Sequence, residues 1–485
     1  MILTIPILIF FSFLTLAVEP DISLAIPKLI GLSGFIVILI TILIVALDRK
    51  KEQLSACFII VFALILRLLF LLQAPTLSDD IYRYCLDGII LINGENPYSY
   101  APIQLLEVEQ SSEFVKNIYP KISNLLLLVN HPQLTTIYPP AAQIIFAIGS
   151  FIDSAFNITG NFVGIKLVLL MMDTLSCILI IKILKRLKLP ACYSTIYAWH
   201  PLPILEISYS GHIDGAAIFF LLMAIFLAST SRSYKITKKS WWNCSIFTQI
   251  FAGLFMGLSI LTKWLPLMFL PFLLLFMKYR KMRLVVSLGC IIAIVIFIAP
   301  FFPDMIKSFV TLNQYLQHWE FSGFFFRVVR NFMLHYTAQS GNVARAIIFV
   351  VFTLLYFIVF IRFFKNSALK NSDNNSRLSV VIDSLFKIAL VWMILTPTLY
   401  PWYALYLVAL LPFKLNANFN TAGITLSWSV LLSYKVLILY KLTGDWIEDT
   451  TISFMIMVAP LTALILQTYI KVHKSHFRLS VIDQH

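Results

Sequence analysis

Long apolar runs are the feature that most constrains how this chain folds. Runs of about 17–23 residues recur from one end of the sequence to the other, and each is long enough to cross a hydrocarbon core of roughly 30 Å. Hydrophobic residues make up 60% of the 485 residues, and charged residues only 12%. No long polar block interrupts this pattern. The sequence therefore predicts an all-α polytopic membrane protein that forms one integral domain over residues 1–485.

Basic residues predict the orientation of the chain. Cytoplasmic loops of membrane proteins carry an excess of Lys and Arg, so we place the basic clusters and both termini in the cytoplasm. The formal net charge of +14 is then explained by loops beside anionic lipid, and it predicts no nucleic-acid partner. The clusters lie at 49–51, 182–188, 232–239, 278–283, 362–377 and 471–478. We expect fourteen transmembrane helices, at 2–17, 26–47, 54–73, 162–181, 190–207, 212–230, 245–262, 264–278, 284–302, 343–364, 381–398, 402–413, 421–440 and 452–470.

One apolar segment does not fit this alternation. Residues 137–153, IYPPAAQIIFAIGSFID, are apolar enough for a helix, but a crossing there would place the basic cluster at 182–188 outside. Pro139 and Pro140 suit the first turn of a helix, where N–H groups lack partners. We predict a re-entrant or interfacial helix on the outer side, covered by protein or by a wet cavity.

The densest charged motif is SDDIYRYCLDG at 78–88. It opens the predicted external loop 74–137, just past the end of an apolar helix. One interpretation is a helix start, with Ser78 as N-cap and with Asp79 and Asp80 favoured by the helix dipole. The other interpretation is an active site. Arg83 lies three residues after Asp80 and could pair with it on one helix face under either interpretation.

Other polar motifs punctuate the outer ends of later helices. SYSGHIDG at 208–215, LTKWLP at 261–266 and TPTLYPWY at 396–403 combine carboxylate, imidazole, ammonium and aromatic groups. The predicted outer loop 303–342 adds further cations. These residue types suit chemistry on a sugar attached to a lipid phosphate, because a carboxylate can deprotonate an acceptor hydroxyl and cations can stabilise a leaving phosphate. The sequence contains no P-loop, no GxGxxG that enters a helix and no zinc-type Cys and His spacing.

Five segments, in this order, resemble the polyprenyl-phosphate-dependent glycosyltransferases of the GT-C superfamily. They are SDDIYRYCLDGIILINGENPYSYAP, TIYPPAAQIIFAIG, SYSGHIDG, TKWLPLMFLP and TPTLYPWY. The chain is similar to bacterial glycosyltransferase family 87-like and mannosyltransferase-like membrane proteins. More distantly, it resembles the first mannosyltransferase of GPI-anchor assembly. The resemblance covers residues 54–412, which would form a GT-C-like catalytic core followed by C-terminal helices at 413–485.

The resemblance implies an inverting transfer in which an Asp of the first external loop is the general base. Lipid A aminoarabinose transferases show an Asp followed three residues later by Arg and then Tyr, which matches Asp80, Arg83 and Tyr84. The pattern of the GPI enzyme instead matches Asp79, so both carboxylates remain candidates. The resemblance implies no required cofactor and leaves a divalent cation, Mg²⁺ or Mn²⁺, open. It implies an enzyme of the cell inner membrane whose active site faces the extracytoplasmic side.

The implied substrates are a polyprenyl-phosphate-linked hexose donor, with mannose as the default sugar, and a lipid or glycan acceptor, and the surrounding membrane lipids are a further partner. We expect Lys263 to bind the donor phosphate, with Arg327 and Arg330 as rivals. His212 and Asp214 would bind substrate hydroxyl groups. The remaining candidates for substrate binding are Arg83, Tyr84, Asp87, His131, Tyr138, Trp402 and Tyr403, although His131 could equally be structural.

Charges within predicted helices keep a second class of function open. Arg67, Lys166 and Asp173 lie inside apolar spans, where ionisable groups are costly and are usually functional or paired. We expect Arg67 to pair with a carboxylate of a neighbouring helix. A multi-pass transporter or flippase of a lipid-linked envelope precursor could use such a buried polar pathway. However, the sequence shows no internal repeat of the transporter kind, and its densest polar motif lies in a loop.

Overall fold

The computed structural model describes residues 4–106, 113–157, 162–230, 244–366, 373–415 and 420–482. Apart from isolated β-bridges between 321–322 and Thr398, all regular elements in these ranges are helical. The α-helices are α1 (Thr4–Ala17), α2 (Ile26–Lys50), α3 (Ala56–Leu71), α4 (Asp80–Ile92), α5 (Glu113–Leu126), α6 (Pro140–Ala155), α7 (Val163–Arg186), α8 (Thr195–Ala198), α9 (Pro201–Pro203), α10 (Asp214–Ser229), α11 (Cys244–Thr262), α12 (Leu270–Phe276), α13 (Arg280–Ile298), α14 (Ile306–His318), α15 (Phe324–Met333), α16 (Ser340–Lys365), α18 (Asn374–Leu395), α19 (Leu405–Leu410), α20 (Asn420–Ser429), α21 (Lys435–Thr443) and α22 (Thr450–Ile482). A π-helix, η6, covers Ile204–Tyr209, and the 3-10 helices are η1 (Ile22–Leu24), η2 (Pro97–Ser99), η3 (Pro102–Leu105), η5 (Ala191–Ser194), η7 (Leu265–Phe269), η8 (Ala299–Phe301), η9 (Pro401–Ala404), η10 (Leu411–Phe413) and η11 (Val430–Tyr434).

Seven helical stretches in the described residues are long and apolar enough to cross a membrane, or eight if one bent pair is a single span. The seven are Ile26–Lys50, Val163–Arg186, Arg280–Phe301, Ser340–Lys365, Asn374–Leu395, Asn420–Thr443 and Thr450–Tyr469. The fold is thus an all-α membrane protein, but the expected fourteen spans are not confirmed. Six other apolar helices have only 10–17 residues. Proline explains in part why some helices are shorter than the predicted spans, because it lacks a backbone N–H and limits helix continuation. Both α9 and η9, for example, begin with a proline.

The predicted helices at 190–207 and 212–230 form the bent pair. Its two halves, Pro201–Tyr209 and Asp214–Ser229, meet at an angle of 117°. Gly211 lies in the turn between them with a φ of +76°, which L side chains rarely adopt. A Cβ at this position would also lie 2.6 Å from Ile81 of α4. The turn therefore packs directly against the first turn of α4.

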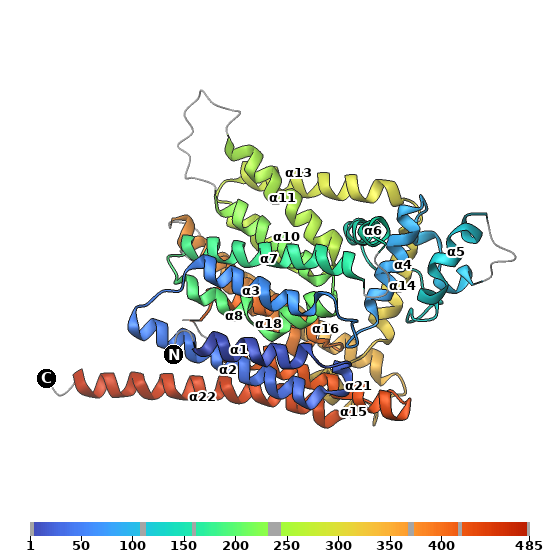
Figure 1. Cartoon of the computed structure of the whole chain (residues 1–485). Helices are drawn as coiled ribbons and strands as arrows, with labels where there is room; N and C mark the ends of the chain where they lie inside the picture. Colours follow the sequence, from blue (N-terminus) through green and yellow to red (C-terminus); the bar gives the residue numbers. More distant parts are fainter. Residues whose placement is uncertain are drawn as a thin grey trace.

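Helices α4, α5, α6 and α14 gather at one end of the bundle formed by the long helices (Figure 1). In that view α6 is seen end-on, whereas α7 runs across the picture. Tyr84 of α4 stacks on Phe146 of α6 with ring centroids 4.3 Å apart. The orientation of α6 agrees with the predicted interfacial helix, whose depth in the membrane stays a prediction.

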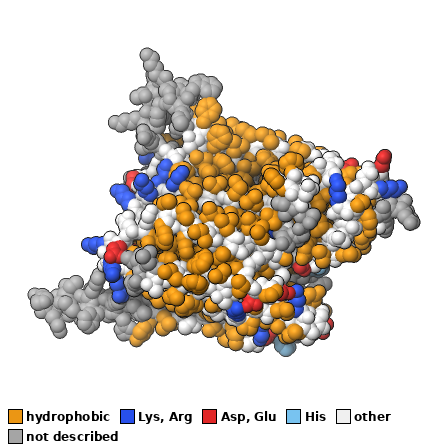
Figure 2. Space-filling view, in the orientation of Figure 1, with side chains coloured by type: hydrophobic (Ala, Val, Ile, Leu, Met, Phe, Trp, Pro, Cys, Tyr) orange, Lys and Arg blue, Asp and Glu red, His pale blue; other side chains and the backbone are white. Residues whose placement is uncertain are grey.

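The long helices expose apolar side chains over a broad surface (Figure 2). On α16, for example, Phe349 is 69% exposed and Leu354 is 59% exposed. Exposed apolar surface of this extent marks an interaction with lipid or protein. In a chain with seven or more apolar spans, lipid is the matching environment.

Ionisable groups in the bundle find partners between helices. Arg67 of α3 donates to Asp173 of α7 at 2.7 Å, and both side chains are fully buried, which confirms the expected pairing of Arg67 with a neighbouring carboxylate. Lys166 donates to the carbonyl oxygens of Phe70 and Gln73 at 2.8 and 2.6 Å. These contacts attach the C-terminal end of α3 to α7 and so fix the segment that leads to Asp80.

Candidate active site

The acidic motif forms the start of α4, but its carboxylates do not cap the helix. Asp79 occupies the N-cap position, and its side chain makes no capping hydrogen bond. Its carboxylate instead accepts from Asn130 Nδ2 at 3.0 Å. The expected N-cap, Ser78, accepts only a long bond of 3.3 Å from the N–H of Asp80. Side-chain capping therefore does not account for the two acids, although both lie at the start of α4, where the helix dipole favours negative charge.

Asp80 faces a recess lined by polar and aromatic groups. Tyr84 Oη lies 3.4 Å and His212 Nδ1 lies 3.6 Å from its Oδ2 atom. The side chain is 31% exposed, and this exposure is toward the cavity described below. Burial raises the pKa of Asp80 to about 6, with Lys263 opposing the shift and the nearby Asp214 and Asp79 carboxylates adding to it. A carboxylate with this pKa is ionised at neutral pH and is a stronger base than an ordinary Asp.

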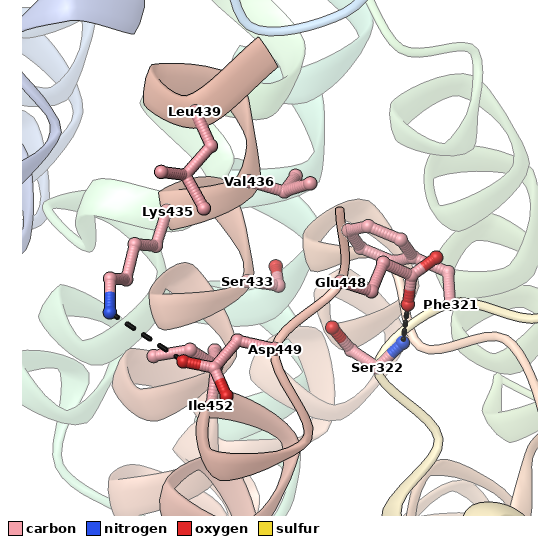
Figure 3. Close-up of a pocket in the computed structure, with 9 residues that line it drawn as sticks. All are labelled: Phe321, Ser322, Ser433, Lys435, Val436, Leu439, Glu448, Asp449 and Ile452. Atoms are coloured by element: carbon pink, nitrogen blue, oxygen red, sulfur yellow. Dashed lines mark hydrogen bonds and ion pairs between the residues drawn. The ribbon is translucent and has the colours of Figure 1, made fainter. Parts of the chain in front are cut away.

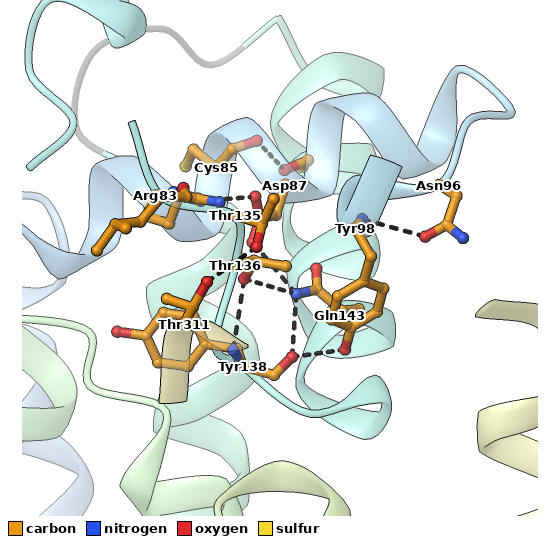
Figure 4. A network of polar contacts seen from close by, with 12 residues as sticks. Arg83, Cys85, Asp87, Asn96, Tyr98, Thr135, Thr136, Tyr138, Gln143 and Thr311 are labelled. Atoms are coloured by element: carbon orange, nitrogen blue, oxygen red, sulfur yellow. Dashed lines mark hydrogen bonds and ion pairs between the residues drawn. The ribbon is translucent and has the colours of Figure 1, made fainter. Parts of the chain in front are cut away.

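Arg83 forms an ion pair with Asp87. The pairing of Arg83 with Asp80 that the sequence suggested is not present. Arg83 Nε lies 2.9 Å from Asp87 Oδ1, and its Nη1 donates to the carbonyl of Leu134 at 3.0 Å. Gln143 of α6 donates to the other Asp87 oxygen at 3.2 Å (Figure 4). Asp87 is thus occupied by structural contacts and does not line the cavity.

The same network holds the loop that precedes α6. Gln143 Nε2 lies 3.1 Å from Thr136 Oγ1 and 3.3 Å from the carbonyl of Tyr138. Tyr98 donates to that carbonyl at 2.6 Å (Figure 4). Arg83 therefore acts from α4, and Gln143 from α6, to fix Tyr138 beside Asp80 and Tyr84.

Lys263 lies directly after the C-terminal end of α11 and points into the same space. Its Nζ is 3.2 Å from Asp214 Oδ2, at the start of α10. The ammonium also lies 5.4 Å from the ring centroid of Tyr138 and 5.7 Å from that of Tyr403. The two rings and one carboxylate hold this cation in place without covering it completely, since the Lys263 side chain is 17% exposed.

These groups line a cavity of about 770 Å³. Its polar part contains Asp79, Asp80, Arg83, Asn130, His131 and Lys263, and its apolar part contains Leu267, Met268, Leu312, Leu316, Phe352 and Trp392. A cavity of this size accommodates a drug-sized ligand or a sugar with part of a lipid. Of the expected site residues, it is lined by Asp79, Asp80, Arg83, His131, Tyr138, Lys263, Trp402 and Tyr403. Tyr84, His212 and Asp214 lie behind this layer, each in contact with one of its members.

The two rival arginines lie elsewhere. Arg327 of α15 forms an ion pair with Glu448 and donates to Ser453 Oγ at 3.0 Å, and Arg330 pairs with Glu320. Neither arginine lines the large cavity. Glu448 also accepts from the backbone N–H of Ser322 at 3.1 Å, beside a recess of about 10 Å³ that holds at most a single water (Figure 3). Arg327 is therefore engaged in holding the segment around Ser322.

Several cavity residues were not expected from the sequence. Tyr315 of α14 has its hydroxyl 2.8 Å from that of Tyr403, and Trp319 meets the ring of His131 edge-on at 4.5 Å. Tyr315 and Trp319 are four apart, so a search for aromatic pairs on one helix face would have found them. Tyr434 lies beyond the predicted core 54–412, and no sequence signal places it here.

Among the described residues, no group of three or more His, Cys, Asp or Glu is arranged to hold a metal ion. The dependence on Mg²⁺ or Mn²⁺ stays an open prediction. The arrangement can instead remove a proton at Asp80, bind an anion at Lys263 and stack a sugar on the surrounding rings.

Comparison with known proteins places the chain in a family. A model of the MptA_B family, described as alpha-(1->6)-mannopyranosyltransferase, N-terminal domain, matches residues 13–279, more than half of the 485 residues. No curated protein and no solved structure matches the chain significantly. The match confirms the resemblance to GT-C-like mannosyltransferases and does not favour the transporter alternative. The chain belongs to the MptA_B family of mannosyltransferases and is a membrane glycosyltransferase.

Proposed function

We propose that this protein transfers a mannosyl residue from a polyprenyl-phosphate-linked donor to a lipid or glycan acceptor, with inversion at the sugar carbon. Asp80 is the general base that takes the proton of the acceptor hydroxyl. Lys263 binds the donor phosphate and stabilises the charge that develops as it leaves. The observation that carries this proposal is that Asp80, Tyr138 and Lys263 line the polar part of one amphipathic cavity, with the Lys263 ammonium 5.4 Å from the centre of the Tyr138 ring.

The two parts of the cavity match the two parts of such a donor. Leu267 and Met268 of η7, Phe352 of α16 and Trp392 of α18 offer an apolar wall to a prenyl chain. Aromatic rings at Tyr138, Trp402 and Tyr403 offer flat faces to a sugar ring. A nucleotide donor would have no use for the apolar wall, so the lining favours a lipid-linked sugar.

Asp80 is preferred over Asp79 as the base. Asp79 is exposed and hydrogen-bonded to Asn130, whereas Asp80 lies beside Tyr84 and near Lys263. One candidate base, Asp80, and one candidate phosphate ligand, Lys263, in the same cavity suit a single direct displacement, which inverts the configuration. Arg83 and Asp87 position the loop that carries Tyr138, and of the two only Arg83 also lines the cavity.

The site lies on the extracytoplasmic side in this proposal. The last turns of α2, α7 and α16 carry Arg49, Lys50, Lys185, Arg186, Arg362 and Lys365. The positive-inside rule places those ends in the cytoplasm. Because α3 starts close after α2 and runs back through the bundle, its C-terminal end and Asp80 lie at the opposite face. A donor on that face is lipid-linked, since nucleotide sugars are cytosolic.

A comparison of donors tests this function. Purified protein in lipid nanodiscs would receive a synthetic α-mannoside acceptor and either radiolabelled polyprenyl-phosphate mannose or radiolabelled GDP-mannose. We expect transfer from the lipid-linked donor only, and a product whose anomeric configuration is opposite to that of the donor. Transfer from GDP-mannose alone would contradict the proposed donor, and retention of configuration would contradict the single displacement.

A further inference from the structure

A buried carboxylate behind Asp80 has no part in the reaction proposed above. Glu206 is fully buried in the π-helix Ile204–Tyr209. Tyr434 Oη lies 2.8 Å from each of its carboxylate oxygens. A buried charge needs strong local interactions, and π-helical turns are frequent at functional sites. Tyr434 also lines the large cavity, so Glu206 is one residue away from the substrate space.

His212 lies between Glu206 and Asp80. Its Nε2 is 3.4 Å from Glu206 Oε2, and its Nδ1 is 3.6 Å from Asp80 Oδ2. Its backbone N–H donates to the carbonyl of Glu206 at 2.8 Å, so the turn fixes the two residues relative to each other. Neither ring nitrogen has a hydrogen-bond partner in the described part of the chain. A movement of a few tenths of an ångström would convert both approaches into hydrogen bonds.

A column of stacked rings holds His212 in this orientation. His212 stacks on Trp402 at 3.9 Å, and Trp402 stacks on Tyr400 at 4.4 Å. Tyr400 stacks on Phe321 at 4.5 Å, and Phe321 exchanges backbone hydrogen bonds with Pro397 and Leu399. Trp402 lines the cavity, whereas His212 does not. The imidazole is therefore screened from the substrate space by the indole.

We propose that His212 and Glu206 form a proton relay behind Asp80, with His212 as a positioning residue rather than a substrate ligand. This inference rests on the proposed function, because it needs Asp80 as the base. Asp80 takes the acceptor proton as the new C–O bond forms and the bond from carbon to the phosphate oxygen breaks. Asp80 then gives that proton to His212 Nδ1, while His212 Nε2 gives its own proton to Glu206. The phosphate leaves as a dianion, and the proton stays on Glu206 until the product has left. It then returns by the reverse transfers through His212 to Asp80, which lines the cavity and releases it there.

Of the other charged groups around the turn, Lys263 is close enough to act on His212 electrostatically. Asp214 and Lys263 are packed against the same turn, but they form an ion pair with each other at 3.2 Å. The carboxylates that face the imidazole nitrogens are those of Asp80 and Glu206. Among the described side chains, Asp80 is therefore the group that gives the proton to His212, and Glu206 is the group that receives one from it.

The first test is chemical rescue. Turnover of radiolabelled polyprenyl-phosphate mannose with a synthetic α-mannoside would be measured for wild type, His212→Gly and Glu206→Gln, with and without imidazole. We expect His212→Gly to lower kcat by about 100-fold with the donor KM changed less than about threefold, and imidazole to restore part of the rate. We expect Glu206→Gln to lower kcat by about tenfold or more, without rescue.

His200 supplies the matched control. It is also fully buried, and its ring contacts Ser427 and the N–H of Leu202 instead of a carboxylate. His200→Gly should gain nothing from imidazole. The relay is refuted if folded His212→Gly keeps kcat within about threefold of wild type, or if it raises the donor KM at unchanged kcat, as a substrate ligand would. It is also refuted if imidazole does not rescue His212→Gly, or if it raises the rate of the His200 variant to the same extent.

A second measurement needs no turnover. Protein labelled with ¹⁵N-histidine would be compared by NMR as wild type, Asp80→Asn and Glu206→Gln, with His212→Gln used for assignment. Both carboxylate variants should shift the ring nitrogens of His212 and leave those of His200 unchanged. Unchanged His212 signals would overturn the relay even if the assay donor were wrong. Shifted signals in a protein that does not use the lipid-linked donor would instead contradict the proposed function and leave the relay geometry standing.

Discussion

Lys263 Nζ lies 3.2 Å from Asp214 Oδ2 and 5.4 Å from the centre of the Tyr138 ring. The cation is thus held by one carboxylate and by aromatic faces, in a cavity that also contains Asp80. This arrangement leaves part of its charge available to an anion. In the proposed reaction the anion is the phosphate of the donor.

Replacement of Lys263 tests this role. Lys263→Met keeps the length of the side chain and removes the charge. We expect donor binding to weaken by about 1.5–3 kcal/mol, which is the range for hydrogen bonds to charged groups. Equilibrium binding of radiolabelled polyprenyl-phosphate mannose to the purified protein would measure it. Lys307→Met is the control, because Lys307 is 49% exposed and pairs with Asp304 outside the cavity. Equal binding by the Lys263 variant and wild type would exclude Lys263 as the phosphate ligand.

The pH dependence of turnover follows from Asp80. Its pKa is raised to about 6, chiefly by burial, and only the ionised form can accept a proton. We therefore expect kcat/KM to rise about tenfold per pH unit below pH 6 and to level off above it. A profile recorded from pH 4.5 to 8 would show this limb. A rate that stays constant down to pH 5 would mean that a group with an ordinary carboxyl pKa controls the reaction.

The raised pKa of Asp80 also affects stability. As the pH rises from about 4 to about 6, this group should lower the stability of the fold, whereas activity should increase. The folded-state pKa of Asp80 lies above its unfolded value of 3.8, so the folded state binds more protons between about pH 4 and pH 6. This contribution to stability is lost as the pH rises through that window. Asp80→Asn should therefore unfold at a higher temperature than wild type at pH 7, and the difference should shrink at pH 4.5. Thermal unfolding in detergent would test this, and a less stable variant at pH 7 would contradict it.

Arg327 and Glu448 should behave as a structural pair. Arg327→Ala and Glu448→Gln are each expected to loosen the segment around Ser322 and to lower kcat to a similar extent, because the two side chains bind each other and that segment. Donor affinity should change little in either variant. If Arg327→Ala alone abolished donor binding, the arginine would be the phosphate ligand and Lys263 would not.

The buried pair of Arg67 and Asp173 should matter for stability. Both side chains are fully buried, and Tyr197 also donates to Asp173, at 2.5 Å. Removing one partner of such a pair typically costs 3–5 kcal/mol, so Arg67→Met should lower thermal stability by about that amount. Lys28→Met breaks a partly exposed pair with Glu19 and should cost about 1 kcal/mol or less. Equal losses in the two variants would contradict the interhelical role assigned to Arg67.

Sequence patterns predicted the elements of this site better than they predicted the spans. Apolar run lengths indicated helices near 26–47, 162–181 and 343–364, and the structure has α2, α7 and α16 there. Run length cannot show where proline and glycine divide a run, as in the short pieces between Ala191 and Tyr209. The count of fourteen spans treated each piece as a crossing.

Charge spacing had a similar limit at the site. The predicted topology placed Asp80, Tyr138, Lys263 and Tyr403 on the outer side, and all four line the cavity. Spacing along α4 did not reveal that Arg83 prefers Asp87, because that choice depends on Leu134 and Gln143 from distant segments. Glu206 and Tyr434 are 228 positions apart, and only the folded chain shows that they meet.

The most direct test of the account compares transfer by wild type, Asp79→Asn and Asp80→Asn. Each purified protein would receive radiolabelled polyprenyl-phosphate mannose and the synthetic α-mannoside, and donor binding would be measured in parallel. Asn cannot take a proton, so Asp80→Asn should lose about 10²–10⁴-fold in turnover while binding the donor as wild type does. Asp79→Asn should lose less than about tenfold. Loss of turnover in Asp79→Asn alone, or full turnover in Asp80→Asn, would contradict the assignment of Asp80 as the catalytic base.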